Sequence, residues 1–248
     1  WRFQCALPAN GDPCGYTISN LTDITLTDRW CLSCTGSNAT PMSIGMRGKS
    51  WLGSTTCWSW HLNFQKKQIP GSLSYNLGNV FARGGALNPA SEWSFTIIDQ
   101  LFAKFADLFG SACSKYNIFG HSAGAQFVHR MVLLSPYSPF DMAIAANAGW
   151  YTLPDLNQAL PYGLNGTSVD EDSLLAPFAR KLVVLLGEED NDPQGKYLNR
   201  SKGAMAQGPH RLARGQNFDA EAKLAAKRLG VSYSWERRTI KSVGHDHR

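Results

Sequence analysis

The stretch Gly120-His121-Ser122-Ala123-Gly124 decides the fold of this chain. It follows an apolar run at residues 116–119 and precedes a segment, 125–132, whose apolar residues recur at spacings of three and four, which predicts a strand, a sharp turn and a helix. A turn this tight strains the backbone of its central serine and favours glycine two positions to either side. The helix that follows directs backbone N–H groups and its positive dipole end toward the serine.

An acidic cluster and a histidine later in the chain are suited to activating such a serine. The clearest strand in the sequence, Lys181 to Gly187, is followed directly by an acidic cluster at residues 188–192. A last strand is predicted where Val231, Tyr233 and Trp235 alternate, and it leads to Gly244-His245. Because ligand and catalytic groups of open α/β sheets lie beyond the carboxyl ends of strands, both groups are expected at one edge of the sheet.

A serine hydroxyl becomes a good nucleophile when a base takes its proton, and the base needs a carboxylate to orient it. The gaps of 68 residues from Ser122 to Asp190 and 55 from Asp190 to His245 each accommodate the intervening strands and helices. We therefore predict Ser122 as nucleophile, Asp190 as orienting acid and His245 as general base. Asp192 and Glu188 are the alternatives for the acid, and His129 is expected to be buried beside Arg130.

An oxyanion hole needs two donors. The backbone N–H of Ala123, directly after the serine, is the expected first donor, and the second normally comes from a loop after an early strand. Residues 1–60 contain no run of four apolar residues, which a buried parallel strand usually needs, and Gly, Ser, Thr and Asn crowd the segment. Their composition predicts either an irregular, loop-rich segment without that strand or a segment that is not in the natural reading frame of the protein.

Composition bounds the remaining possibilities. The 248 residues, 43% of them hydrophobic, suit one globular domain with a substantial core. No apolar run approaches eighteen residues, so no membrane span is expected. The chain opens with Trp1 and shows no secretory signal there, so we expect the natural start to be absent and slightly favour a cytoplasmic location.

Charge and cysteine patterns point to no further partner. Residues 196–248 hold 12 Lys/Arg and 4 Asp/Glu, a surplus of eight in a chain of net charge +5. Because these charges are dispersed, solvated helix faces are favoured over a nucleic-acid site. Cys31 and Cys34 have metal-knuckle spacing, but no second Cys or His pair follows at a usual distance, so no metal site is expected. Whether the six cysteines form disulfides depends on the compartment.

A pocket is expected beyond a further buried strand at residues 142–146. Trp150 and Tyr151 follow the end of that strand and are the predicted substrate-binding residues. The polar segment 152–176 is long for a loop, which predicts a lid-like insertion, with a disordered surface loop as the alternative. Helical periodicity predicts helices over 91–108 and 217–229.

From about Ile69 to His245 the chain resembles bacterial α/β-hydrolases related to polyhydroxybutyrate depolymerases and similar carboxylesterases. The residues that carry the resemblance are Tyr75-Asn76-Leu77-Gly78-Asn79-Val80, Trp93-Ser94-Phe95, the elbow from Phe119 to Arg130, Asn147-Ala148-Gly149-Trp150-Tyr151, Leu186-Gly187-Glu188-Glu189-Asp190 and Val243-Gly244-His245. The resemblance implies an α/β-hydrolase fold with a mostly parallel sheet and helices on both faces, the N-terminal part being irregular or incomplete. It divides the chain into an atypical segment, 1–60, and a hydrolase domain, 61–248.

The expected activity is that of a serine hydrolase that cleaves an ester, or less favourably an amide or thioester, through an acyl-enzyme. The substrate is a small or polymeric ester, and neither cofactor nor metal is needed. Two other classes stay open: a non-catalytic binding protein that keeps the elbow for structural reasons, and an acyltransferase that shares the acyl-enzyme step. The oligomeric state is not predicted.

Overall fold

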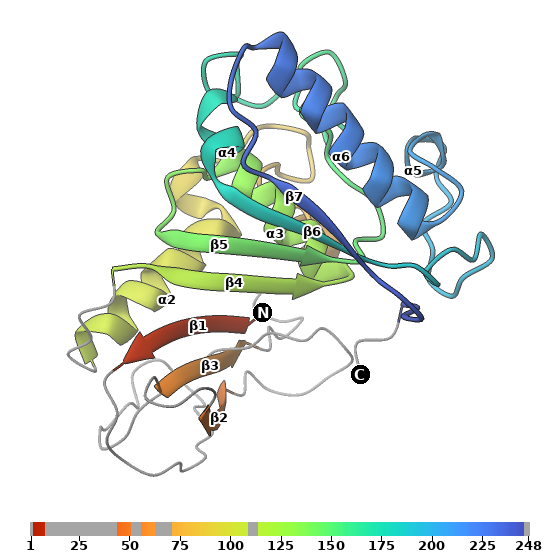
Figure 1. Cartoon of the computed structure of the whole chain (residues 1–248). Coiled ribbons are helices and arrows are strands. Elements are labelled where there is room, and N and C mark those ends of the chain that lie inside the picture. The colour runs from red at the N-terminus through yellow and green to blue at the C-terminus, as the bar shows by residue number, and fades with distance from the viewer. Residues whose placement is uncertain (1, 8–43, 51–55, 63–70, 109–113, 246–248) are drawn as a thin grey trace.

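The computed structural model describes residues 2–7, 44–50, 56–62, 71–108 and 114–245. Within these residues seven strands form one sheet in the order β2-β3-β1-β4-β5-β6-β7 (Figure 1). The strands are β1 (Arg2–Leu7), β2 (Ile44–Ser50), β3 (Thr56–Leu62), β4 (Tyr116–His121), β5 (Phe140–Ala146), β6 (Lys181–Gly187) and β7 (Glu236–Ile240).

The half of the sheet from β4 to β7 is parallel. The predicted strand at 181–187 is confirmed as β6, and those at 116–119 and 142–146 are confirmed as parts of β4 and β5. Leu182, Val184 and Leu186 of β6 are at most 1% exposed, because helices cover this part of the sheet. The carboxyl ends of the parallel strands lie at one edge, on the right in Figure 1.

The other half of the sheet is antiparallel. β1 pairs with both β3 and β4, and β2 pairs with β3. Residues 1–60 were expected to be irregular, whereas β1, β2 and the start of β3 lie there. The difference has a physical cause, since long apolar runs mark strands of buried parallel sheets and antiparallel strands do not need them. The proposed boundary at residue 60 falls within β3, and the division at that point stays a prediction.

Helices flank the sheet, as expected for the α/β class. They are α1 (Gly71–Ser74), the 3₁₀ helix η1 (Ala90–Glu92), α2 (Ser94–Leu108), α3 (Ala123–Leu134), α4 (Leu175–Ala179), α5 (Lys202–Ala206) and α6 (Arg211–Arg228). The fold class is thereby confirmed. α2 contacts α3 through Phe95 and Phe127, and α3 contacts α6 through His129 and Phe218.

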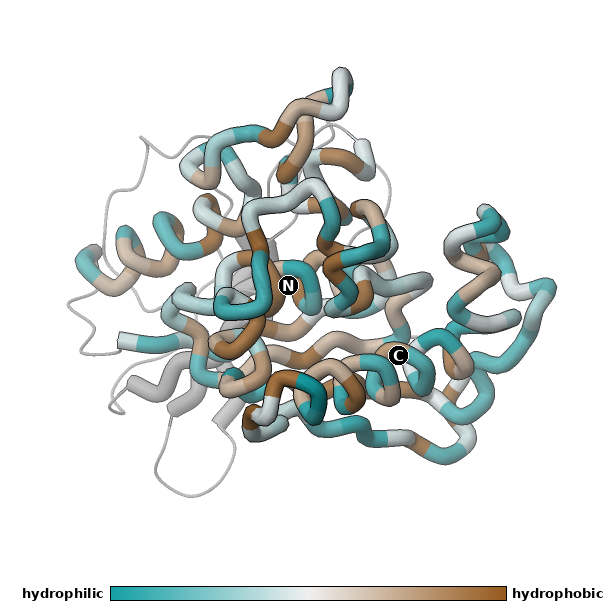
Figure 2. The backbone as a smooth tube through the Cα atoms, turned by 90° about the horizontal axis from the view of Figure 1, so that it is seen from above, coloured by the Kyte–Doolittle hydropathy of each residue, from teal (hydrophilic) through white to brown (hydrophobic). Residues whose placement is uncertain are grey.

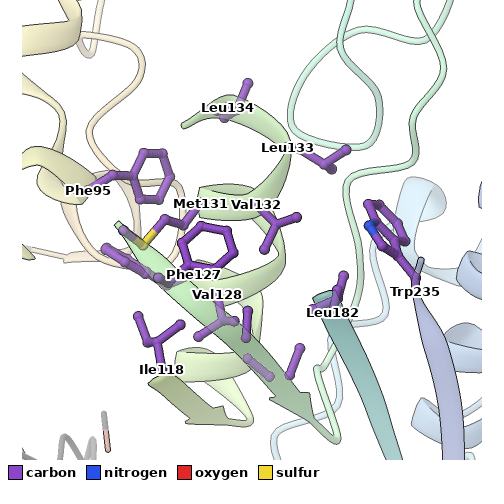
Figure 3. Close-up of a cluster of buried hydrophobic side chains, with 14 of the residues drawn as sticks. Phe95, Ile118, Phe127, Val128, Met131, Val132, Leu133, Leu134, Leu182 and Trp235 are labelled. Atoms are coloured by element: carbon purple, nitrogen blue, oxygen red, sulfur yellow. The ribbon is translucent and has the colours of Figure 1, made fainter. Parts of the chain in front are cut away.

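The hydrophobic core is centred on α3. Every residue from Gly124 to Leu134 is buried, which is typical of a helix enclosed on all sides. Figure 3 shows Phe95 on one side of α3 and Trp235 on the other, with Leu182 of β6 among the side chains around it. Along the outer helices hydrophobic and hydrophilic residues alternate instead (Figure 2). In the described part of the chain, every helix is too short or too polar to span a bilayer.

The last strand and the last helix differ from their predicted bounds. The alternation at 231–235 lies before the strand, which begins at Glu236. Trp235 and Tyr233 instead pack in an aromatic cluster with Phe178, so their alternation reflects burial and not strand pairing. The helix expected at 217–229 begins six residues earlier, at Arg211.

The segment 152–176 connects β5 to α4 and packs on the core. Leu164 and Leu174 are fully buried, and Ala159 and Asn165 form an isolated bridge. Ser168, Val169 and Ser173 line a surface pocket with residues 133–138, which precede β5, so this part of the segment lies at the edge opposite the carboxyl ends. A lid function for the segment stays a prediction. The six cysteines, on which the zinc and disulfide expectations rest, lie outside the side chains that the structure describes.

Candidate active site

The turn between β4 and α3 has the strain predicted for it. Ser122 adopts φ 55° and ψ −112°, in the left-handed region that L-residues rarely occupy. A Cβ at Gly120 would lie 2.3 Å from the carbonyl oxygen of Gly124, so glycine is required there. A Cβ at Gly124 would meet only the hydroxyl of Tyr75, at 3.5 Å, so the predicted steric need for glycine applies to Gly120 alone.

Three side chains that are far apart in sequence meet beside this turn. His245 Nε2 lies 3.0 Å from Ser122 Oγ, and His245 Nδ1 lies 2.8 Å from Asp190 Oδ2. Because a carboxylate only accepts, Nδ1 carries the proton, and Nε2 is left to accept the serine O–H. Asp190 is 5% exposed and His245 31%, so the acid is enclosed while the imidazole reaches solvent.

The two alternative acids point elsewhere. The side chain of Asp192 is exposed and accepts the backbone N–H of Gln194. The carboxylate of Glu188 accepts the hydroxyl of Thr239, on β7. Of the three acidic residues considered, Asp190 is therefore the one that contacts the histidine.

The turn that carries the acid is joined to the loop that carries the histidine. The N–H of Glu189 donates to the carbonyl oxygen of Val243 at 3.0 Å, and that of Glu188 donates to Ile240 at 3.0 Å. A Cβ at Gly187 would lie 2.3 Å from the carbonyl oxygen of Val243. This glycine therefore permits the close approach of the two backbones that brings Asp190 and His245 together.

Asn147 fixes the same junction from β5. It has φ 49°, and its side chain donates to the carbonyl oxygen of Gly244 at 3.1 Å and accepts the N–H of Gly187 at 2.8 Å. One amide thus joins the residue before His245 to the end of β6. This role of Asn147 could not be predicted from the sequence, because its partners lie 40 and 97 residues away.

Arg211 is a further residue that sequence reasoning missed. Its Nη1 lies 3.3 Å from Asp190 Oδ1, and both side chains are at most 5% exposed. The only sequence signal would have been a helix that starts at Arg211, after the acidic cluster. The helix was predicted to start at residue 217 instead, so Arg211 was not considered.

The expected oxyanion donor, Ala123, is the first residue of α3. The first N–H groups of a helix lack intrahelical partners and carry its positive dipole end, so this N–H suits a developing oxyanion. The second donor was expected from a loop after an early strand. The segments that follow β2 and β3, at 51–55 and 63–70, lie outside the described residues.

The two predicted substrate-binding residues differ in exposure. Trp150 is 9% exposed and packs between the guanidinium of Arg130, at 4.2 Å, and the ring of Tyr162, at 4.9 Å. Tyr151 is fully buried and stacks on Phe218 at 4.5 Å, so contact with a substrate would require its ring to leave the core. The substrate-binding role of both residues stays a prediction.

His129 is buried beside Arg130, as predicted. Its Nδ1–H donates to the carbonyl oxygen of Ala125 at 2.9 Å, and its Nε2 accepts the N–H of Thr152 at 3.0 Å, which fixes the neutral imidazole. Burial, and secondly the charge of Arg130, holds the pKa of His129 well below its usual value. Burial also lowers the pKa of Arg130, to about 9. Among the described residues, no group of three His, Cys, Asp or Glu side chains is arranged to hold a metal ion.

No protein-family model matches the chain, and no curated protein matches it either. Two enzymes are among the solved structures that are similar over 75% of this chain. Poly(aspartic acid) hydrolase-1 from Sphingomonas sp. KT-1 is 40% identical, is covered over 71% of its length and superposes with a TM-score of 0.74. LpqC, poly(3-hydroxybutyrate) depolymerase from Bordetella parapertussis, is 33% identical, is covered over 64% of its length and has a TM-score of 0.71. The chain therefore belongs to the α/β-hydrolase family, with these two enzymes, and is a hydrolase of that type.

Proposed function

We propose that this protein is a serine-dependent carboxylic ester hydrolase that works through an acyl-enzyme on Ser122. The observation that carries the proposal is the hydrogen-bonded chain from Ser122 Oγ through the imidazole of His245 to the carboxylate of Asp190. In that arrangement a weakly nucleophilic hydroxyl gains a base, and the base gains a group that orients it and stabilises its charged form.

In the acylation step, Ser122 Oγ attacks the ester carbonyl carbon while His245 Nε2 takes the hydroxyl proton. The negative charge that develops on the carbonyl oxygen is stabilised by the N–H of Ala123 and the positive end of α3. When the intermediate collapses, the C–O bond to the alcohol breaks and His245 returns the proton to the leaving oxygen. Water then attacks the carbonyl carbon of the acyl-enzyme while His245 takes its proton. His245 returns this proton to Ser122 Oγ as the carboxylic acid is released.

The strained serine supports this assignment. A non-glycine residue in the left-handed region costs on the order of 1–3 kcal/mol, which the surrounding structure has to offset. Here the N–H of Ser122 donates to the carbonyl oxygen of Ala146 at 2.9 Å, and its own carbonyl accepts the N–H of Gln126 at 3.1 Å. These bonds hold the hydroxyl at the sheet edge, where a substrate can reach it.

Polymer hydrolysis is the favoured form of the activity. The depolymerase relative acts on poly(3-hydroxybutyrate), a polyester, which supports an ester substrate. A second candidate is the amide bond of an acidic polypeptide, and the observation that favours it is the 40% identity to the hydrolase of poly(aspartic acid). Both reactions use the same acyl-enzyme and differ in the leaving group, an alcohol or an amine.

Parallel assays test the proposal. Purified protein is incubated with p-nitrophenyl esters of increasing acyl length, with poly(3-hydroxybutyrate) and with poly(aspartic acid), and Ser122→Ala serves as the control. Ester cleavage that Ser122→Ala abolishes is the expected result. Cleavage of poly(aspartic acid) alone would mean that the bond cleaved is an amide and not an ester. Faster transfer of the acyl group to added alcohols than to water would indicate an acyltransferase. If no substrate is cleaved, the ester hydrolase proposal fails in favour of a binding protein.

A further inference from the structure

The carboxylate of Asp190 has two partners, one on each oxygen. Oδ2 accepts from His245 at 2.8 Å, and Oδ1 lies 3.3 Å from Arg211 Nη1. The side chains of Arg211 and Asp190 are 4% and 5% exposed, so this ion pair is shielded from solvent. A pair so enclosed is screened little by salt, and losing either partner leaves a buried charge without compensation.

The start of α6 holds Asp190 through its main chain as well. The N–H of Leu212 donates to the carbonyl oxygen of Asp190 at 3.0 Å. The second guanidinium nitrogen of Arg211 donates to the carbonyl oxygen of Lys196 at 2.8 Å. This bond fixes the guanidinium against the segment that follows Asp190. The same helix start therefore fixes both the backbone and the carboxylate of Asp190, and its positive dipole end adds to the charge of Arg211.

We propose that Arg211 is a positioning residue for the catalytic acid. The inference rests on the proposed function, because it assigns Arg211 to the triad of Ser122, His245 and Asp190. Arg211 compensates the charge of the buried carboxylate and holds its rotation so that Oδ2 faces His245 Nδ1. It does not touch the reacting atoms and acts only through Asp190.

The other charged and titratable groups around the acid do not replace this cation. In the described residues, Asp190 faces His245, Arg211 and the neutral phenol of Tyr151. The ring of His121 lies 5.0 Å from that of His245, on the side of the base. The ammonium of Lys196 lies over the ring of Tyr197, at 4.9 Å, and the carboxylate of Glu188 binds Thr239.

The pH dependence of Ser122 labelling by a fluorophosphonate tests the proposal. The rate is measured from pH 5 to 9 for the wild type, Arg211→Gln, Arg211→Lys and Arg200→Gln. Arg200→Gln is the control, because it removes the same charge from an exposed residue of the neighbouring loop. Thermal unfolding of each variant reports whether it is folded.

In Arg211→Gln, the pH profile of the rate is expected to differ from that of the wild type, because the buried carboxylate loses the cation that compensates its charge. The rate on the plateau is expected to fall about ten-fold or more, since the carboxylate is free to turn. Arg211→Lys keeps the charge and is expected to restore the shape of the pH profile, with a lower plateau because one ammonium cannot bind both Asp190 and the carbonyl oxygen of Lys196 as the guanidinium does. Arg200→Gln is expected to match the wild type.

An Arg211→Gln variant that is folded and has the wild-type profile would overturn the proposal. If Arg211→Gln does not fold, Arg211→Lys decides: a lower plateau supports the positioning role, and a plateau equal to that of the wild type contradicts it. A folded wild type that is not labelled at all would instead defeat the proposed function, so the two failures are distinguishable.

Discussion

The side-chain amide of Asn147 donates a hydrogen bond to the carbonyl oxygen of Gly244 at 3.1 Å, across 97 residues of sequence. Gly244 directly precedes His245, so the amide fixes the backbone from which the imidazole projects. The oxygen of the same amide accepts the N–H of Gly187 at the end of β6. One side chain that belongs to neither loop thus joins the backbone before the base to the end of the strand that precedes the acid.

Replacing Asn147 by alanine is expected to lower both stability and activity. The buried N–H of Gly187 loses its partner, which costs about 1–3 kcal/mol in the free energy of unfolding. A shift of His245 by about 1 Å is expected to lower the rate of ester cleavage on the order of 100-fold. Asn147→Asp keeps the acceptor for Gly187 but presents a buried oxygen to the carbonyl of Gly244, so we expect it to recover only part of the stability and none of the activity. Equal rates in the wild type and both variants would contradict the role given to this residue.

Gly187→Ala is expected to abolish most of the activity for steric reasons. The new methyl group would lie 2.3 Å from the carbonyl oxygen of Val243 and 2.9 Å from that of Gly244, so the loop that carries His245 has to move. Gly84→Ala is the matched control, because a Cβ there has no neighbour within 4 Å. Turnover of a p-nitrophenyl ester should fall at least about 100-fold in the first variant and stay unchanged in the second. Wild-type turnover in folded Gly187→Ala would show that the close approach is unimportant.

The accuracy of the predicted elements depends on how each is buried. The five apolar residues of β6 mark a strand covered by helices, and its predicted bounds agree with the structure. Every residue of β7 is exposed, and Glu236, Arg237 and Arg238 open it, so no apolar pattern marks it. The aromatic residues just before it supplied a stronger but misleading alternation. At the start of α6, the buried Arg211 and Arg214 occupy positions where apolar residues would have signalled the inner face.

Stability is expected to fall as the pH drops below about 6.5, the ordinary pKa of an exposed histidine. Burial holds the pKa of His129 well below that value in the folded protein, so between the two pKa values the unfolded chain binds a proton that the folded chain does not. The contribution of His129 to the free energy of unfolding is fully present above about pH 6.5. It is lost as the pH falls, at up to about 1.4 kcal/mol per pH unit. Urea unfolding from pH 5 to 8 measures the slope.

The variant His129→Gln isolates this contribution. The other histidines are retained, so the difference in slope between the two proteins belongs to His129. We expect the variant to be less stable at pH 8, since it loses well-formed bonds to Ala125 and Thr152, but to have a shallower slope below pH 6.5. Parallel slopes would mean that His129 does not keep a lowered pKa in the folded protein.

Trp150→Ala is expected to change the discrimination among acyl lengths. The indole follows the carboxyl end of β5 and packs on Arg130 and Tyr162, so its removal leaves a cavity next to the strand end. Ratios of kcat/KM for short and long p-nitrophenyl esters should shift toward the long ester, by roughly 10-fold if one or two methylene groups enter the cavity. Trp150→Phe, which keeps an aromatic ring, should shift less. If the ratio is unchanged in Trp150→Ala, the residue does not line the acyl pocket.

The site could be predicted from the sequence where chain order carries the information. The order of serine, acid and histidine, each after a strand, selected the three residues that the structure brings into contact. Asn147 and Arg211 could not be assigned in this way, because their contacts depend on the packing of distant backbone segments. The burial of Tyr151 was also hidden, since its neighbour Phe218 belongs to a helix 67 residues later in the chain.

Labelling with a fluorophosphonate, with the modified residue located by mass spectrometry, tests the central claim most directly. We expect stoichiometric modification of Ser122 in the wild type, and a rate lower by at least about 1000-fold in His245→Ala and Asp190→Asn. A folded wild type that stays unlabelled, or equal labelling rates in the wild type and His245→Ala, would contradict the claim that His245 and Asp190 activate Ser122.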